Sequence, residues 1–538
     1  MVPKFVTPGA YVEETSSGVR NVVRAATSIT AFVGRTWRGS IDEPLMVSSF
    51  ADYEREFGGL WRGSSVSYAV QQYFLNGGGK AIVVRVVNGS TEGSTAAAPV
   101  TLSLRAGTSL TAASTGSWGR NLRASVNHAA GNTADASLFD LTIFDDPASQ
   151  LDSERRGGSG LRETFRDVSI DANSERFVSK VLREQSQLVR VQKLGAKRPR
   201  IQSATAPMAT SGSDGVLTGS VAIATIAAAS EIIGDVVART GVNALLKTSG
   251  FNLLCIPPLV FARETLATTW ERMEIDVPTH VLQAAAAFCT EQRAMLIVDA
   301  PRDWDFAAAM ENIANFRESL GSGKNVAVYF PRLRMIDPLR SDPLEDFAPC
   351  GAIAGIMART DASLGVWKAP AGANANLAGT LGLSIKGAPG NVTNEENHQL
   401  NPLGVNCLRN FAATGYIVWG ARTLGDYDWL YIPVRRLALF IEESVVSSTQ
   451  WAKFEPNDES MWAQIRLDIE AFMHALFVEG AFQGSTSREA FFVKCGHETT
   501  TNLDLENGIF NVEIGFAPLR PAEFIVIRIQ QAAMQAKT

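Results

Sequence analysis

The spacing of apolar side chains predicts a compact mixed α/β fold for the first 90 residues. Apolar residues recur at i, i+3, i+4, i+7 and i+8 over Val66–Phe74, which predicts a helix that ends at Asn76-Gly77. Residues 28–33 and 81–87 are mostly apolar, with several β-branched side chains, as in buried strands. One helix between two such strands is typical of an α/β arrangement.

Apolar strands alternate with helical segments between residues 221 and 360. The predicted strands cover residues 251–256, 295–299 and 325–330, and the predicted helices cover residues 279–293 and 304–319. Short apolar strands separated by helices indicate a parallel sheet that is covered on both faces.

The segment between these two parts has a different composition. Residues 88–121 are rich in Gly, Ser, Thr and Ala, which marks a boundary. Residues 121–210 then alternate strand-like runs, such as 138–144, with polar and basic loops, and Ser203–Ser220 is again rich in small residues. This pattern predicts a β-rich insert.

The last part of the chain predicts an α+β arrangement. Asn457 is placed to cap a long helix whose apolar face includes Trp462, Ile465 and Leu476 and which ends at Gly480. Strands are predicted at residues 490–494 and 508–516. In the second of these strands apolar and polar side chains alternate, so one face is expected to be buried.

Both ends of the chain are predicted to be extended segments whose backbones need hydrogen-bonding partners. An apolar strand close to the C-terminus contains Phe524, Ile525, Val526, Ile527 and Ile529. Its backbone needs hydrogen-bonding partners, either in an internal sheet or by addition to a neighbouring molecule. Near the other end, Pro3, Pro8 and Gly9 favour an extended backbone, with Tyr11 and Val12 following, so a second exchangeable arm is expected.

Composition and charge exclude several classes of protein. The 538 residues contain 49 Lys+Arg and 55 Asp+Glu, a net charge of −6, which argues against a protein that binds polyanions. A length of 538 residues suggests three or four domains, and 46% hydrophobic residues suffice for a large core. No apolar run approaches the roughly 20 residues of a membrane span. The first residues, MVPKFVTPGA, do not form a secretory signal.

No motif for a cofactor or a metal is found. The nearest approach to a phosphate-binding loop, Gly321–Asn325, lacks the first glycine of that motif and ends in Asn rather than Ser or Thr. G-x-S-x-G and H-E-x-x-H are absent, the five histidines lack ligand spacing, and the five cysteines form no C-x-x-C pair. We therefore expect neither a cofactor nor a metal site.

Asp299 is the best single candidate for catalysis, because it ends a predicted parallel strand. The alternative is that its carboxylate caps the turn at Ala300-Pro301 or the next helix, which we favour because no second acid or histidine is placed to assist it. Arg435-Arg436 could contact an acidic partner or belong to a solvated face.

Several segments resemble contractile tail sheath proteins, and they occur in the same order along the chain as in that family. They are residues 7–14 (TPGAYVEE), 27–34 (TSITAFVG), 73–78 (YFLNGG), 358–361 (ARTD), 365–372 (GVWKAPAG), 401–406 (NPLGVN), 419–424 (WGARTL) and 454–458 (FEPND). The resemblance covers roughly residues 1–90 and 220–538, whereas the insert near 120–210 fits less well.

The resemblance implies a subunit that polymerises as stacked rings around an inner tube and contracts to drive the tube through a target envelope. It also implies a multidomain α/β and α+β fold with a β-rich insert, a subtilisin-like α/β middle domain without the protease triad, and an α+β core built from both ends. The expected parts are an arm (1–23), a first core segment (24–90), the insert (91–220), the α/β domain (221–375), the tube-facing core (376–521) and a second arm (522–538).

The resemblance further implies that both arms complete a sheet in neighbouring subunits. The arms correspond to Pro3–Val23 and Ala522–Gln531 here. As a surface stretch that could face the tube we nominate Arg435, Arg436, Glu442 and Glu443. The expected partners are further copies of the chain, the inner tube protein, and baseplate and terminator or cap proteins, without nucleic acid, cofactor or catalysis.

The expected location is the bacterial cytoplasm during assembly and then a phage tail or a phage-tail-like injection particle. Residues 60–77 and 454–484 are more similar to injection-system sheaths. Two alternatives remain: a hydrolase built on residues 221–360 with Asp299, and a static shell or adhesin subunit.

Overall fold

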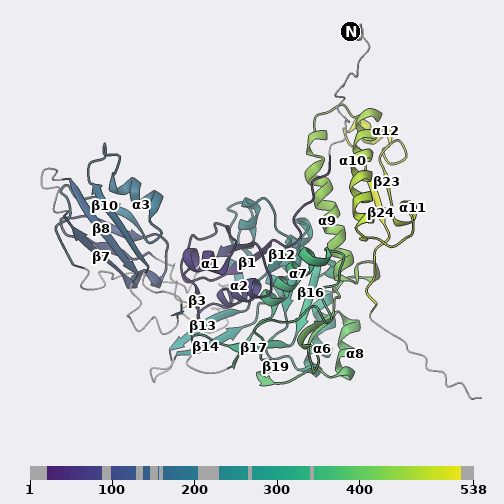
Figure 1. The fold of residues 1–538 in the computed structure, drawn as a ribbon, viewed down its shortest axis with the longest axis horizontal. Helices are drawn as coiled ribbons and strands as arrows, with labels where there is room; N and C mark the ends of the chain where they lie inside the picture. Colours follow the sequence, from purple (N-terminus) through teal and green to yellow (C-terminus); the bar gives the residue numbers. More distant parts are fainter. Residues whose placement is uncertain are drawn as a thin grey trace, which may run out of the picture. The chain divides into compact units, whose positions relative to one another are not determined.

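The computed structural model describes residues 21–87, 99–128, 137–145, 155–156, 161–203, 229–264, 270–339 and 344–522. The chain folds into two compact units, which we treat separately (Figure 1). Unit 1 consists of residues 1–25 and 437–538, and unit 2 consists of residues 26–436. Helices and sheets occur in both units, so the predicted mixed α/β multidomain fold is confirmed.

An eight-stranded sheet forms the centre of unit 2. Its strands, in spatial order, are β2 (Leu45–Val47), β4 (Ala81–Arg85), β1 (Thr30–Gly34), β12 (Leu253–Cys255), β15 (Met295–Asp299), β16 (Val326–Phe330), β21 (Val405–Phe411) and β22 (Gly415–Trp419). The six inner strands are parallel, and β2 and β22 run antiparallel at the two edges.

Helices cover both faces of this sheet (Figure 1). Along β1, Ala31 and Val33 pack into one apolar cluster and Phe32 packs into another, because successive side chains point to opposite faces. The first face packs against α5 (Thr279–Glu291), α6 (Phe306–Ser319), α8 (Asn394–Leu400) and the 3-10 helix η3 (Gly241–Lys247). The second face packs against α1 (Phe50–Phe57), α2 (Ser65–Leu75) and α7 (Cys350–Leu364).

Two glycines let α7 approach α2 very closely. A Cβ atom added to Gly351 would lie 2.0 Å from the carbonyl oxygen of Ala69, and one added to Gly355 would lie 2.5 Å from that of Tyr73. Both pairs are spaced by four residues, one turn of each helix, so the two backbones meet along a line of contact. No side chain larger than hydrogen fits at these two positions of α7.

Smaller sheets complete unit 2. One contains β18 (Leu344–Phe347), β17 (Arg332–Ile336), β19 (Gly382–Ile385) and β20 (Ala388–Pro389), and a hairpin contains β13 (Leu259–Glu264) and β14 (Trp270–Ile275). A short pair joins β3 (Leu60–Trp61) to β9 (Arg155–Arg156).

The predicted β-rich segment has its own apolar core. One antiparallel sheet contains β10 (Arg162–Ser169), β8 (Leu138–Asp145) and β7 (Leu122–Asn127), and another contains β11 (Val189–Lys193), β6 (Ser109–Ala112) and β5 (Thr101–Ser103). Helix α3 (Val178–Gln185) packs with them. Trp118 is fully buried in this core, and its indole N–H donates to the carbonyl oxygen of Ser114 at 3.2 Å.

Unit 1 contains most of α9 (Ile432–Ser448), α10 (Glu459–Val478), α11 (Ser487–Ala490), α12 (Asn502–Glu506) and the antiparallel strands β23 (Phe491–Lys494) and β24 (Glu513–Phe516). The long helix was predicted correctly, but the capping residue was not. Asp458 accepts the hydrogen bond from the N–H of Met461 at 2.9 Å, whereas Asn457 accepts from the indole N–H of Trp462.

The structure divides the chain differently from the sequence-based boundaries. Residues 30–85, which we had assigned to a core shared with the C-terminal part, supply three strands to the same sheet as β12, β15 and β16. Likewise, β21 and β22 belong to unit 2, although we had expected residues 376–521 to form one core. The reason is that β1 pairs with β12 and β16 pairs with β21, and local patterns do not contain these pairings.

All five cysteines are free and buried. Burial raises the pKa of Cys407 to about 12 and that of Cys495 to about 11, because the thiolate loses its hydration. These thiols therefore behave as small apolar side chains.

Replacing Gly355 by Ala should lower the free energy of unfolding of unit 2 by about 1–3 kcal/mol, because the new methyl group would meet the backbone of α2. Urea unfolding followed by fluorescence measures the change. The control is Ser363→Ala on the exposed end of the same helix, which should change stability by less than about 0.5 kcal/mol. Equal stability of the two variants would show that α2 and α7 can separate without cost.

Candidate functional site

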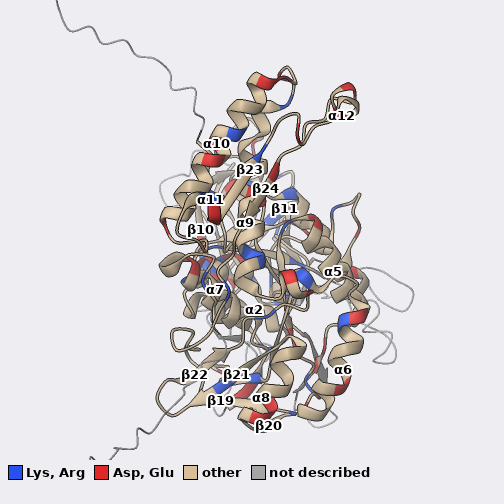
Figure 2. Cartoon of the chain, turned by 90° about the vertical axis from the view of Figure 1, so that its right-hand side faces the viewer, with Lys and Arg blue, Asp and Glu red and all other residues tan. Residues whose placement is uncertain are grey.

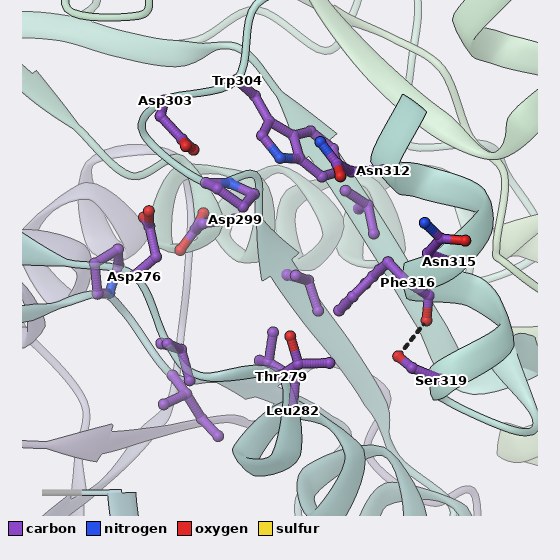
Figure 3. A pocket seen from close by; sticks show the side chains of 16 residues that line it. Asp276, Thr279, Leu282, Asp299, Asp303, Trp304, Asn312, Asn315, Phe316 and Ser319 are labelled. Atoms are coloured by element: carbon purple, nitrogen blue, oxygen red, sulfur yellow. Dashed lines mark hydrogen bonds between the residues drawn. The ribbon is translucent and has the colours of Figure 1, made fainter. Parts of the chain in front are cut away.

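A cavity of about 530 Å³ opens at the carboxyl end of β15 (Figure 3). Three aspartates line it, Asp276, Asp299 and Asp303, together with apolar side chains that include Trp304 and Phe316. This edge of a parallel sheet is where α/β proteins usually bind ligands, so the location agrees with the candidate role of Asp299.

Asp299 caps the N-terminus of a helix. Its Oδ1 accepts a hydrogen bond from the N–H of Cys350, the first residue of α7, at 2.7 Å. Pro349, which precedes α7, makes no side-chain cap, so this carboxylate supplies the missing acceptor. Asp299 therefore caps a helix, but this helix is α7. The predicted cap at the turn Ala300-Pro301 or at the next helix was wrong, because Asp305 caps α6.

Burial raises the pKa of Asp299 to about 6, which the hydrogen bond from Cys350 opposes. Its Oδ2 is buried, and no hydrogen-bond partner for this atom is found among the described residues. The carboxyl group is therefore costly to ionise in this position.

Asp276 and the neighbouring Glu274 form ion pairs with Arg332. This arginine is 5% exposed and pairs with Glu274 and, at 3.0 Å, with Asp276. Asp276 also accepts from the backbone N–H of Arg302 at 3.1 Å. Asp303 is exposed on the following loop. Sequence analysis missed this network, because its members come from β14, β17 and the segments beside them.

Among the described residues that line the cavity, no nucleophile lies beside a histidine that could activate it. Asp299 contacts a helix terminus and not a histidine, and Asp276 is neutralised by Arg332. Among the described residues, no group of three or more His, Cys, Asp or Glu could hold a metal ion. The geometry therefore supports a structural role for these aspartates better than a catalytic one.

Arg435 and Arg436, nominated as surface residues, are each only 4% exposed. Arg436 forms two hydrogen bonds to the carboxylate of Asp361, at 2.6 and 2.8 Å, and a third to the carbonyl oxygen of Thr27 at 2.9 Å. Arg435 donates to Oδ1 of Asn325 at 2.7 Å and stacks over Trp429. The expectation of an exposed pair is wrong for these two residues, since both have partners within unit 2.

The two glutamates nominated in the same stretch are more exposed than the two arginines. Glu442 is exposed and Glu443 is half-buried on α9. Glu442 and Glu443 stay the predicted tube-facing residues of this stretch.

The described end of the N-terminal segment lies along α9 in unit 1. The N–H groups of Val23 and Ala25 donate to the hydroxyl oxygens of Ser448 and Ser444, at 2.9 and 3.0 Å. Arg24 forms an exposed ion pair with Glu479. The two serines are one helical turn apart, so they hold the backbone of this segment parallel to the helix axis.

The strands β23 and β24 pair only with each other within the described part of unit 1. A two-stranded sheet is marginal by itself and is stabilised when a further strand pairs at an edge. Just beyond β24, Pro518 forms an isolated bridge with Phe482. Tyr11, Val12, Phe524, Ile525, Val526, Ile527 and Ile529, the predicted arm residues, lie outside the residues that the structure describes.

None of the described helices is long and apolar enough to cross a membrane. Two family models match the chain. Residues 278–424 match the phage tail sheath protein central domain, and residues 425–532 match the phage tail sheath C-terminal domain.

Two tail sheath proteins are similar in sequence. The chain is 26% identical over 315 residues to a prophage major tail sheath protein of Pseudomonas aeruginosa, which covers 56% of this chain and 73% of the relative. It is 21% identical over 287 residues to the tail sheath protein of Vibrio phage KVP40, which covers 51% of this chain and 40% of the relative.

Solved sheath structures share the fold over nearly the whole chain. The contracted sheath complex of the extracellular contractile injection system PVC has a TM-score of 0.55 and 21% identity, covering 98% of this chain and 99% of that chain. The contracted helical sheath of the anti-feeding prophage has a TM-score of 0.54 and 22% identity, covering 98% and 100%. A sheath tail protein from Listeria innocua has a TM-score of 0.55 and 12% identity, covering 92% and 96%.

Replacing Asp299 by Asn should make stability less dependent on pH. Because the folded-state pKa of about 6 exceeds the unfolded value near 4, the folded state binds the proton more tightly, and the contribution of Asp299 is lost as pH rises through 6. On going from pH 4 to pH 7.5, the free energy of unfolding of the variant should therefore rise by about 2–3 kcal/mol relative to that of the wild type. Urea unfolding at both pH values measures this gain. Asp303→Asn is the exposed control. A difference in unfolding free energy between Asp299→Asn and the wild type that does not change with pH would contradict the raised pKa of Asp299.

Replacing Arg436 by Met should destabilise unit 2 by about 3–5 kcal/mol, because Asp361 is left buried without its counter-charge. Adding Asp361→Leu should restore most of the loss, since the unpaired charge is then removed. Thermal unfolding of both variants is the measurement, with the exposed Arg302→Met as control. If the double variant is no more stable than Arg436→Met, the loss of the ion pair is not the cause of the destabilisation.

Proposed function

We propose that this chain, which carries both phage tail sheath domains, is the structural subunit of a contractile sheath. Such a subunit polymerises as stacked rings around an inner tube and contracts to drive the tube through a target envelope. The similarity of the fold to two contracted injection-system sheaths over 98% of the chain supports this function.

The open two-stranded sheet of unit 1 is the observation that carries the proposal. β23 and β24 have no further strand beside them in the described part of the unit. Arms from neighbouring subunits, residues 3–23 and 522–531, would add strands to its edges and supply main-chain hydrogen bonds between subunits. The backbone clamps at Ser444 and Ser448 support this arrangement, because they fix where the N-terminal arm leaves its own subunit.

We infer that the chain has no catalytic role. Asp299, the residue on which a hydrolase would depend, is used to cap α7. The expected partners are further copies of the chain, the inner tube protein, baseplate proteins and terminator or cap proteins. The fold agreement with a chain in the baseplate structure of the anti-feeding prophage, over 98% of this chain, supports an association with a baseplate.

We place the protein in a phage tail or a phage-tail-like particle, assembled in the bacterial cytoplasm. An injection particle is favoured over a virion, since the two injection-system sheaths cover 98% of the chain. Its contraction distinguishes it from a static shell, which would form polymers of one length.

Deleting residues 523–538 should leave a folded protein that forms no sheaths, because the C-terminal arm is missing and the sheet of the neighbouring subunit stays incomplete. Negative-stain electron microscopy of the expressed chain, with and without its tube protein, detects the sheaths. Circular dichroism checks that the truncated chain is folded.

The matched control is deletion of residues 532–538 only, which keeps the apolar strand 524–529 and should preserve assembly. Normal sheaths from the longer deletion would refute the role of the arm. Polymers of the wild type in a single fixed length under all conditions would instead favour the static shell.

A further inference from the structure

The cavity at the carboxyl end of β15 has its polar side chains in two groups (Figure 3). Asp276, Asp299 and Asp303 lie on one side, and the polar and aromatic residues of α6 lie on the opposite side. Its volume of about 530 Å³ is that of a site for a small molecule. Much of the remaining wall is apolar and includes the buried side chains of Leu282, Val298, Trp304 and Val328.

The charged residues in the wall of this cavity are all acidic. The 16 residues that line it include three aspartates and no Lys, Arg or His. Figure 2 shows acidic and basic positions on α6, but its charged residues, Glu311, Arg317 and Glu318, do not line the cavity. The residues of α6 that do line it are uncharged: Asn312, Asn315, Phe316 and Ser319.

The charges behind the wall do not cancel those of the aspartates. Arg332 pairs with both Glu274 and Asp276, so one positive charge is shared by two carboxylates. With the exposed Arg302, which precedes Asp303, two arginines stand against four carboxylates. The cavity therefore lies in a negative region, which favours a ligand of positive charge.

Asp299 shows most directly what such a ligand would change. Its carboxyl group is buried, and burial raises its pKa to about 6. A cation in the cavity would favour the ionised form and so offset part of this cost. The other titratable and charged groups that surround Asp299 are Cys350 on α7, Arg332 on β17, Glu274 on β14, Asp276, Arg302 and Asp303 in the adjoining loops, and His280 at the start of α5.

We propose that this cavity binds an organic ammonium cation, with its charged end beside the aspartates and its apolar body against Trp304 and Phe316. An inorganic cation would leave the apolar wall in contact with water, and a neutral ligand would leave the carboxylates without a counter-charge. The faces of aromatic rings also attract ammonium groups. The site lies within unit 2 and does not depend on the proposed sheath function.

The test measures binding of phenethylammonium to the purified full-length chain by isothermal titration calorimetry. Phenethyl alcohol has nearly the same shape without the charge, and phenylacetate carries the opposite charge. The wild type should bind the ammonium with a dissociation constant on the order of 1 mM, about tenfold more tightly than the alcohol and more tightly still than phenylacetate. Equal affinity for the ammonium and the alcohol, or no binding of either, would overturn the inference.

Two pairs of variants locate the bound probe. Asn315→Trp places a bulky side chain at an exposed position of the cavity wall and should weaken binding at least about fivefold, whereas Ala314→Trp, at the next exposed position and outside the cavity, should bind as wild type. Asp303→Asn removes one carboxylate and should weaken binding about two- to fivefold, whereas Glu311→Gln should not.

Circular dichroism checks that all four variants are folded. Wild-type affinity in both Asn315→Trp and Asp303→Asn would show that the probe binds elsewhere and would overturn the inference. The proposed function is tested separately by the formation of sheaths, which none of these results decides.

The pH dependence of binding tests the part of Asp299. The ammonium group stays protonated while Asp299 loses its proton as pH rises through about 6, so the wild type should bind phenethylammonium several-fold more tightly at pH 7.5 than at pH 5. Asp299→Asn should lose most of this dependence. The same pH dependence in both proteins would overturn the role of Asp299 in binding.

Discussion

The buried ion pair between Arg436 and Asp361 connects three segments of unit 2 that are distant along the chain. It joins the end of α7 to the start of α9, and through the carbonyl oxygen of Thr27 it also holds the segment that leads into β1. Charges buried to this degree are stable only as a pair with further hydrogen bonds. The first turn of α9 is therefore fixed before the chain passes into unit 1, and Arg435 adds a second attachment at Asn325 beside β16.

The elements of the fold were predictable from sequence where a local pattern determines them. The strands at 295–299 and 325–330 and the helices at 279–293 and 304–319 were found within two residues, because continuous apolar runs and helical spacing are local signals. The neighbours of each strand were not predictable. β1 lies between β4 and β12, which starts more than 200 residues later, and an apolar strand shows only that both its faces are covered.

The partners of the site residues were likewise not predictable from sequence. A basic dipeptide such as Arg435-Arg436 has the same sequence signature on a solvated face and in a buried pair, because the deciding partners, Asn325 and Asp361, are distant along the chain. The carboxylate of Asp299 likewise meets the N–H of Cys350 only through the fold. By contrast, β23 and β24 lie within the segments 490–494 and 508–516 that local patterns predicted as strands, and in the second of these segments apolar and polar positions alternate.

The burial of all five cysteines has a consequence for durability. A polymer brings identical surfaces of many copies into repeated contact, so one accessible thiol per subunit would place reactive sulfur atoms side by side along the whole filament. Oxidation could then lock neighbouring subunits covalently and prevent them from moving past one another. Buried thiols such as those of Cys407 and Cys495, whose pKa values are raised, resist this exchange, so the proposed sheath would not be cross-linked through them in an oxidising environment.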